Sequence, residues 1–259
     1  MTSTSVLRVS GVTKRYRHVQ ALRGVDLEVR PGEVHALLGD NGAGKSTLMK
    51  ILAGAVAPSS GTIEVNGTRV SFSKPSEAQD AGIETVYQDL ALASSLTPGE
   101  NLFLGREIMR PGLLGRLGFV DRRAMDREAV EQLAGLGART PRPDVEVESL
   151  SGGQRQAVAV ARAARWGSAL IMMDEPTAAL GVSQTASVLE LIRRVRDERK
   201  LSVLLISHSL PDVFAVADRA TVLRMGATVM TEELSALSTN DVIAAMTGST
   251  FAPTREESP

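Results

Sequence analysis

The segment Gly39–Thr47, GDNGAGKST, satisfies the pattern G-x-x-x-x-G-K-[ST]. Its glycines let successive backbone N–H groups face one anion, and a helix that follows adds the positive end of its dipole. In this pattern Lys45 reaches the β- and γ-phosphates of a nucleotide, and the Ser46 hydroxyl binds Mg²⁺. A loop that needs glycine only for its turns is the alternative, but this loop lies between a predicted strand and a predicted helix. The residues expected to contact a nucleoside triphosphate are Gly39, Asp40, Asn41, Gly42, Ala43, Gly44, Lys45, Ser46 and Thr47.

Two acidic residues follow the apolar run 169–173. Asp174 and Glu175 should emerge at the carboxyl edge of a parallel sheet, where ligands collect. A carboxylate there can hold Mg²⁺, and a second one beside it can polarise a water for attack on the γ-phosphate. Helix capping is the alternative without chemistry. Beside a phosphate loop, we expect Asp174 to bind the metal and Glu175 to act as general base.

Three other side chains could reach the same site. His208 follows the apolar run 202–206, where a neutral imidazole could donate to the γ-phosphate, whereas His18 and His35 are expected to be structural. Gln88 ends the predicted strand GIETVYQ, so its amide could contact Mg²⁺ or the attacking water. Tyr16 precedes the phosphate loop and could stack on adenine. For Gln88 and Tyr16, residue chemistry alone leaves a structural role equally open.

A second glycine pair opens another predicted helix. Ser151, Gly152, Gly153 and Gln154 belong to the stretch LSGGQ, whose helix N-terminus would present N–H groups and a hydroxyl to an anion. One nucleotide does not need two such cradles. We therefore expect a head-to-tail homodimer in which the Ser151 segment of one protomer closes over the phosphate loop of its partner. Hydrolysis would then require dimerisation.

These residues need a scaffold that gathers strand ends at one edge. Three apolar runs are short and unbroken, as buried parallel strands are, and they span residues 34–38, 169–173 and 202–206. Predicted helices alternate with them and span residues 45–53, 152–166 and 183–199. Ser183 is the expected cap of the last helix. The alternation predicts an α/β fold with a parallel sheet, and the first seventy residues add a β-rich part.

The segment from about residue 89 to 137 differs in composition. It contains Pro98, Pro111 and several glycines, and six arginines lie between Arg106 and Arg127. We predict a helical insert between the β-rich part and the later strands. The arginines are interspersed with acidic residues, which favours a solvated face, and a docking surface is the alternative.

The composition of the chain limits its domain number and the classes of function that remain. The 259 residues suffice for one large α/β domain or two small ones, with a formal net charge of −1 and no cysteine. Near neutrality argues against nucleic-acid binding through a basic surface, and the lack of cysteine excludes disulfides and thiolate metal sites. The first residues lack a signal-peptide pattern, and no apolar run approaches the ~20 residues that cross a bilayer. If the protein works on a membrane, another subunit must cross it.

The order Tyr16, GDNGAGKST, Gln88, LSGGQ, ALIMMDEPT, ISH resembles the ATP-binding cassette ATPases over essentially the whole chain. The resemblance implies a RecA-like P-loop NTPase core with an antiparallel β subdomain and a helical signature subdomain. It implies that Tyr16 stacks on adenine and that Gln88 belongs to the Q-loop. It also supports the head-to-tail dimer with ATP between the subunits.

More narrowly, VYQDLALA, NLFLGRE and DEPTAALGV look like the importers of simple sugars, of the ribose, xylose and fructose type. This resemblance implies an ATPase subunit that powers monosaccharide uptake through transmembrane permease subunits, with an extracytoplasmic sugar-binding protein. Many relatives fuse two cassettes, whereas this chain holds one, as in the fructose-like branch. A cassette ATPase for another substrate or direction, or a soluble one without transport, is the alternative.

One motif departs from the family pattern. The D-loop usually contains Ser-Ala-Leu-Asp, but here Ala178 and Gly181 replace the Ser and the Asp, so its role across the dimer is not carried over. We expect one cassette domain over residues 1–250, with the helical subdomain at about 89–165 and a frayed tail at 251–259. The implied location is the cytoplasmic face of the cell membrane, as a peripheral subunit.

Overall fold

The central layer of the molecule is a six-stranded sheet. The computed structural model describes residues 5–138, 142–178 and 180–249. In these residues the strands of this sheet span Val34–Leu38 (β3), Ile83–Val86 (β6), Leu170–Asp174 (β7), Ser202–Ile206 (β8), Arg219–Arg224 (β9) and Ala227–Glu233 (β10). Their order is β10-β9-β3-β8-β7-β6, and all run parallel except β10, which pairs antiparallel with β9. The carboxyl ends of β3, β6, β7 and β8 therefore share one edge.

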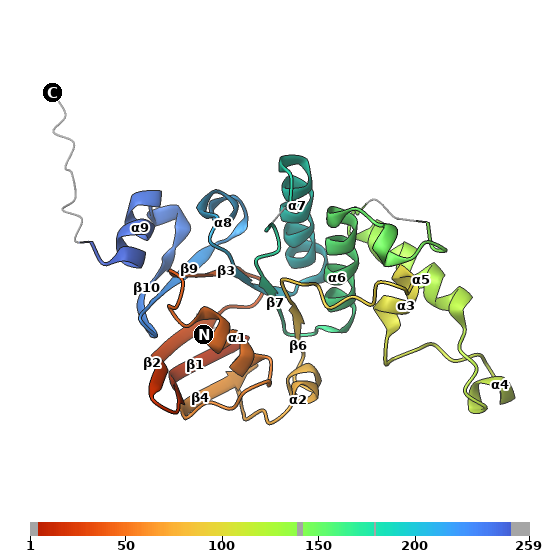
Figure 1. Ribbon diagram of the computed structural model, residues 1–259, viewed down its shortest axis with the longest axis horizontal. Coiled ribbons are helices and arrows are strands. Elements are labelled where there is room, and N and C mark those ends of the chain that lie inside the picture. Colours follow the sequence, from red (N-terminus) through yellow and green to blue (C-terminus); the bar gives the residue numbers. More distant parts are fainter. Residues whose placement is uncertain (1–4, 139–141, 179, 250–259) are drawn as a thin grey trace.

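A second, antiparallel sheet lies beside the first. Its strands span Leu7–Tyr16 (β1), Val19–Val29 (β2), Ser60–Val65 (β4) and Thr68–Val70 (β5). Their order is β2-β1-β4-β5, and Figure 1 shows them at the lower left, next to the central sheet. This sheet is the β-rich part expected from the first seventy residues.

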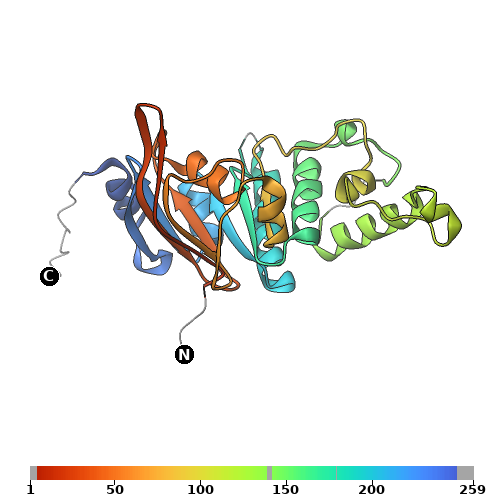
Figure 2. The same ribbon diagram turned by 90° about the horizontal axis from the view of Figure 1, so that it is seen from below.

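Helices cover the central sheet and extend the molecule on one side. Those packed on or beside the sheet span Lys45–Leu52 (α1), Pro75–Asp80 (α2), Gly152–Trp166 (α6), Val182–Arg199 (α7), Leu210–Val216 (α8) and Thr239–Thr247 (α9). A helical part at the far end spans Pro98–Phe103 (α3), Leu113–Arg116 (α4) and Arg122–Gly135 (α5) (Figures 1 and 2). Single 3-10 turns span Val147–Ser149 (η1) and Leu234–Ala236 (η2). Across the described ranges, every helix is too short or too polar to span a membrane.

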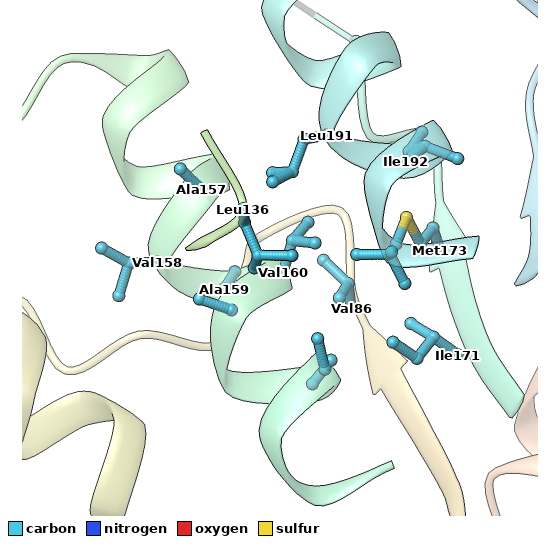
Figure 3. Close-up of a cluster of buried hydrophobic side chains, with 14 of the residues drawn as sticks. Val86, Leu136, Ala157, Val158, Ala159, Val160, Ile171, Met173, Leu191 and Ile192 are labelled. Atoms are coloured by element: carbon cyan, nitrogen blue, oxygen red, sulfur yellow. The ribbon is translucent and has the colours of Figure 1, made fainter. Parts of the chain in front are cut away.

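Side chains alternate between two apolar clusters on the faces of the central sheet, as the period of a strand requires. Met172 and Leu204 pack toward α1 and the antiparallel sheet. Ile171, Met173 and Leu205 pack toward α6 and α7, and Figure 3 shows Ile171 and Met173 among side chains of both helices. Each fully buried side chain of this kind contributes about 1.5–3 kcal/mol to stability. The two clusters thus hold α1 on one face of the central sheet and α6 on the other.

The central elements follow the sequence prediction closely. The strands β3 and β8 and the helix α6 have the predicted bounds, β7 lies one residue later than predicted, and α1 ends one residue earlier. The predicted insert is helical, with α3, α4 and α5 between β6 and β7. The capping prediction for α7 is wrong. The helix begins at Val182, so Gly181 and not Ser183 occupies the N-cap position, and the Gly181 amide donates to the Gln184 side chain at 3.3 Å. The predicted tail at 251–259 lies outside the described residues.

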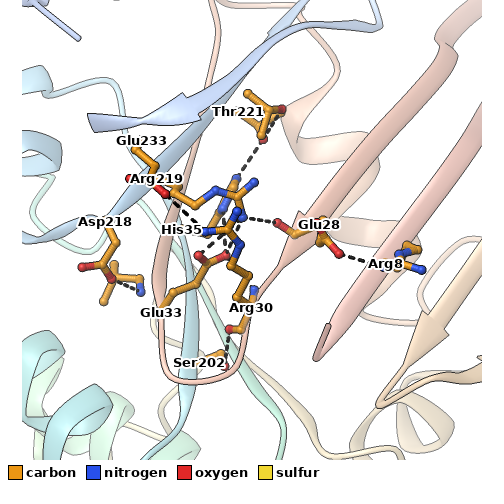
Figure 4. A network of polar contacts seen from close by, with 12 residues as sticks. Arg8, Glu28, Arg30, Glu33, His35, Ser202, Asp218, Arg219, Thr221 and Glu233 are labelled. Atoms are coloured by element: carbon orange, nitrogen blue, oxygen red, sulfur yellow. Dashed lines mark hydrogen bonds and ion pairs between the residues drawn. The ribbon is translucent and has the colours of Figure 1, made fainter. Parts of the chain in front are cut away.

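A buried polar cluster ties β3 to β9 (Figure 4). The His35 Nδ1 atom lies 3.1 Å from Glu33 Oε1, and its Nε2 atom lies 2.8 Å from the Thr221 hydroxyl. The Arg219 guanidinium pairs with Glu33 at 3.4 Å. Burial opposes ionisation of Glu33, but hydrogen bonds from His35 and the Arg30 amide prevail and hold its pKa below the usual range. His35 is therefore a structural residue, as predicted.

Candidate active site

The phosphate loop connects β3 to α1. Gly39, Gly42 and Gly44 have φ angles of 148°, 81° and 107°, a region that favours glycine. A Cβ atom at Gly39 would overlap the carbonyl oxygen of Leu223, and one at Gly44 would lie 2.6 Å from a side-chain carbon of β2. Glycine is therefore required at both positions. The helix α1 begins directly after them at Lys45, so its first N–H groups face the loop without helical partners.

The Lys45 ammonium group lies over this loop. Its Nζ atom donates to the carbonyl oxygens of Gly39 at 2.6 Å and Asp40 at 3.1 Å. Burial lowers the pKa of Lys45, although the carboxylates of Glu175, Asp40 and Asp174 oppose that shift. A cation in this place can exchange carbonyl oxygens for the charged oxygens of a phosphate, which are stronger acceptors.

The predicted pair of carboxylates lies at the carboxyl end of β7. Asp174 is the last residue of that strand; burial and the neighbouring Glu175 raise its pKa, and Lys45 opposes the shift. Glu175 has a φ of 49°, a left-handed conformation that is uncommon for a residue with a side chain. Its amide donates to the Ile206 carbonyl of β8 at 2.8 Å, which holds this conformation. Backbone strain of this kind is concentrated at functional sites.

His208 contacts the predicted general base. Its Nδ1 atom lies 3.0 Å from Glu175 Oε1, with the His208 side chain 69% exposed and the Glu175 side chain 25% exposed. The two residues follow neighbouring strands, since β7 and β8 are adjacent in the sheet. The sequence predicts a separate role for each residue but does not predict their contact. Because the His208 ring is so exposed, it can contact a ligand and the Glu175 carboxylate at the same time.

The loop and the strand ends line one cavity of about 530 Å³. The predicted site residues in its wall are Asn41, Gly42, Ala43, Gly44, Lys45, Ser46, Thr47, Gln88, Asp174 and Glu175. Gly39 and Asp40 connect to this wall through their bonds to Lys45, and His208 does so through Glu175. The structure thus gathers residues from four distant segments of the chain at one sheet edge.

Part of the wall comes from residues that the predicted site did not include. They are Val19, Gln20, Ala21, Arg23, Ile206 and Met225. The β2 residues reach the loop only because the antiparallel sheet packs beside it, and no spacing in the sequence signals that packing. Tyr16 is not among the residues that line the cavity, but it pairs between β1 and β2 with Val19, which does line it. Tyr16 is 41% exposed, and Lys14 Nζ lies 5.1 Å from its ring centre.

The oxygen donors in the cavity suit a hard cation. The Ser46 hydroxyl, the Gln88 amide and the Asp174 carboxylate lie in the same wall, and Mg²⁺ prefers such ligands. The part of the chain that the structure describes contains no group of three or more His, Cys, Asp or Glu side chains that could hold a metal. The glycine loop, the free amides and Lys45 suit the phosphates themselves.

The Ser151 segment lies at the N-terminus of α6, and none of its residues lines this cavity. The Ser151 hydroxyl accepts from the Gln154 amide at 3.3 Å, and the Gln154 side chain accepts from the Ser151 amide at 3.0 Å. The amides of Gly152 and Gly153 precede the first helical hydrogen bond and remain available to an anion. A hollow of about 660 Å³ between α6 and α7 includes Ser151, Gly153 and Gln154. The two half-sites are separate within one chain.

The atypical D-loop forms a turn without its usual polar residues. The Thr177 hydroxyl donates to Asp212 Oδ2 at 2.7 Å, which fixes the start of this segment to α8. The Ala178 amide donates to the carbonyl three residues earlier at 3.1 Å, and Gly181 caps α7. Ala179 lies outside the described residues. The backbone here therefore needs neither Ser nor Asp to fold.

The chain is similar to known proteins over most of its length. The model of the ABC transporter family matches residues 22–178. A fructose import ATP-binding protein of Rhizobium meliloti is 48% identical over 255 residues, with 98% of each chain covered. A ribose import ATP-binding protein of Burkholderia cenocepacia is 43% identical over 244 residues, which cover 94% of this chain and 46% of that protein. Among solved structures, the ADP conformation of MJ1267, an ATP-binding cassette of an ABC transporter, covers 94% of this chain and 99% of that chain, with a TM-score of 0.76 and 25% identity.

Proposed function

Because this chain belongs to the ABC transporter family, we propose that it hydrolyses ATP to power the import of a simple sugar through partner membrane subunits. The ATPase part rests on one observation, the cavity that holds Lys45, Ser46, Gln88 and the Asp174–Glu175 pair. The sugar part rests on relatives that are named for fructose and ribose import. The match to the fructose relative covers 98% of each chain.

The predicted site residues have distinct roles in hydrolysis. Lys45 and the loop amides bind the phosphates, and Tyr16 stacks on adenine. Ser46, Gln88 and Asp174 would hold Mg²⁺, which supplies positive charge for the phosphate oxygens. Glu175 accepts a proton from the water whose oxygen attacks the γ-phosphorus, while the bond to the leaving ADP oxygen breaks.

His208 supports this base. Its contact at 3.0 Å fixes the Glu175 carboxylate, and its exposed ring reaches the γ-phosphate from the side of β8. Hydrolysis yields ADP and phosphate, so a hydrogen bond to the γ-phosphate exists only before the reaction. His208 thereby distinguishes the ATP-bound site from the ADP-bound site.

The second half of each site comes from a second copy of the chain. Within one chain the Ser151 segment lies apart from the cavity, and its free amides suit an anion. A two-fold, head-to-tail homodimer brings the Ser151, Gly152, Gly153 and Gln154 segment of each protomer over the phosphate loop of the other. ATP then lies between the subunits.

The remaining partners follow from the transport role. The chain works as a peripheral subunit at the cytoplasmic face of the cell membrane, attached to transmembrane permease subunits. An extracytoplasmic sugar-binding protein delivers the sugar to the permease. Nucleic acid has no part in this function.

Purification from membranes tests the proposal. The tagged chain is purified from detergent-solubilised membranes of its native host, its ATP hydrolysis is measured, and co-purifying chains are identified by mass spectrometry. We expect ATP hydrolysis, a polytopic membrane protein and a secreted sugar-binding protein. Recovery from the soluble fraction with ribosomal or DNA-associated partners would refute the transport role and leave the ATPase chemistry in place.

A further inference from the structure

The loop that carries Gln88 has an unusual backbone. Two successive residues with side chains, Leu90 and Ala91, have φ angles of 63° and 44°. This left-handed region is costly for any residue other than glycine, and asparagine or aspartate visit it more readily than leucine or alanine. The Leu90 amide donates to the Tyr87 carbonyl at 2.9 Å and closes a tight turn around Gln88. Such a turn persists only where surrounding contacts hold it.

One arginine of α6 makes those contacts. Arg162 Nη1 donates to the Ala91 carbonyl at 2.7 Å, and Arg162 Nη2 donates to the Leu90 carbonyl at 3.0 Å. The planar guanidinium thus binds both left-handed residues at once, which the single ammonium of a lysine could not do in the same way. The Leu90 side chain is half-buried and packs against the apolar cluster that contains Met173, whereas Ala91 is exposed. Arg162 adds the polar contacts to both left-handed carbonyls.

The same helix begins with the Ser151 segment. Arg162 lies eleven residues after Ser151, so about 16 Å of rigid helix separates them. We propose that Arg162 is a positioning residue that fixes Gln88 in the ATP cavity and ties it to the helix that binds the partner's nucleotide. A shift of the Ser151 end of α6 then moves the turn that carries Gln88. The catalytic part of this inference rests on the proposed ATPase function.

A spin label tests the mechanical part without any ATPase assay. The chain has no cysteine, so Ala91→Cys gives a single site for a nitroxide label on an exposed residue of the turn. Arg165→Gln is the matched control, because Arg165 is a partly buried arginine of the same helix that contacts Glu128 and Gln132 instead of the turn. We expect Arg162→Gln to mobilise the label and Arg165→Gln to leave it immobile. Equal mobility in all three proteins would overturn the proposal.

A double-mutant cycle tests the catalytic part. We expect Arg162→Gln to lower kcat by ~10- to 100-fold with little change in the KM for ATP, because a misplaced group costs about that much. In a Gln88→Ala background the same substitution should have no further effect, whereas two independent defects would multiply and would overturn the coupling. Arg162→Lys keeps the positive charge but cannot make both hydrogen bonds of the guanidinium, so it should show an intermediate kcat. It replaces Arg162→Gln in the cycle if that variant does not fold. Absence of hydrolysis in the unsubstituted protein would refute the ATPase function alone, since the spin label still decides the positioning role.

Discussion

Glu175 lines the cavity, has a strained backbone and contacts His208, so its carboxylate is the group whose removal affects hydrolysis most directly. Glu175→Gln keeps the size of the side chain and its contact with the imidazole but removes the proton acceptor. We expect the rate of phosphate release to fall by ~10²- to 10⁴-fold while equilibrium ATP binding is retained. Glu232→Gln, at an exposed carboxylate of β10, is the control and should hydrolyse ATP normally. A wild-type rate in Glu175→Gln would assign the base to another residue.

The lowered pKa of Glu33 leads to a second prediction about a single residue, on how stability depends on pH. Its pKa in the folded protein is lower than the usual value of 4.5, so its contribution to stability is complete above pH 4.5 and is lost as the pH falls through the folded pKa. Glu33→Gln should therefore reduce the free energy of unfolding at pH 7 by roughly 1–3 kcal/mol. The difference between the two proteins should shrink progressively below pH 4.5. Urea unfolding at pH 7 and at pH 4 or lower measures it, and a difference independent of pH would contradict the assignment.

At the scale of elements, Asn101 joins α3 to the loop that follows the Gln88 turn. Its side chain is fully buried; Oδ1 accepts from the Ala93 amide, and Nδ2 donates to the Ala93, Leu96 and Thr97 carbonyls at 3.0–3.3 Å. Asn101→Ala would leave these buried groups without partners, so we expect a loss of at least ~2 kcal/mol in the free energy of unfolding. Thr97→Ala removes only the cap of α3 and should cost about 1 kcal/mol. Equal losses in the free energy of unfolding would contradict the larger effect expected for Asn101→Ala.

The elements also show what the sequence could predict and what it could not. The bounds of β3, β8 and α6 follow from local signals, because an unbroken apolar run and a capped amphipathic segment need no knowledge of their neighbours. The contact of His208 with Glu175 depends on the order of strands in the sheet, and the β2 part of the cavity wall depends on how two sheets pack. The turn that Arg162 holds has no local signal, since leucine and alanine do not favour a left-handed backbone. Tertiary contacts determine all three.

At the scale of the whole molecule, the proposed dimer predicts that association depends on ATP. In that proposal ATP binds in the cavity of one chain, and the Ser151 segment, which does not line this cavity, closes over the cavity of a second copy. If closure requires intact ATP, a variant that binds but does not hydrolyse it should accumulate as a dimer. The dimer is therefore best observed in the Glu175→Gln background.

Ser151→Arg tests this closure. In the Glu175→Gln background we expect ATP with Mg²⁺ to shift the protein from monomer to dimer in light scattering, and ADP to leave it monomeric. Adding Ser151→Arg places a bulky cation at the N-terminus of α6, where it blocks the approach of the partner and opposes the helix dipole. The combined variant should stay monomeric with near-normal ATP affinity, because the cavity itself is unchanged. The control is Ser235→Arg in the same Glu175→Gln background, at an exposed serine near β10. This protein should still form the dimer. Loss of ATP affinity in monomeric Ser151→Arg would contradict the separation of the half-sites, since it would mean that Ser151 acts on the nucleotide of its own chain.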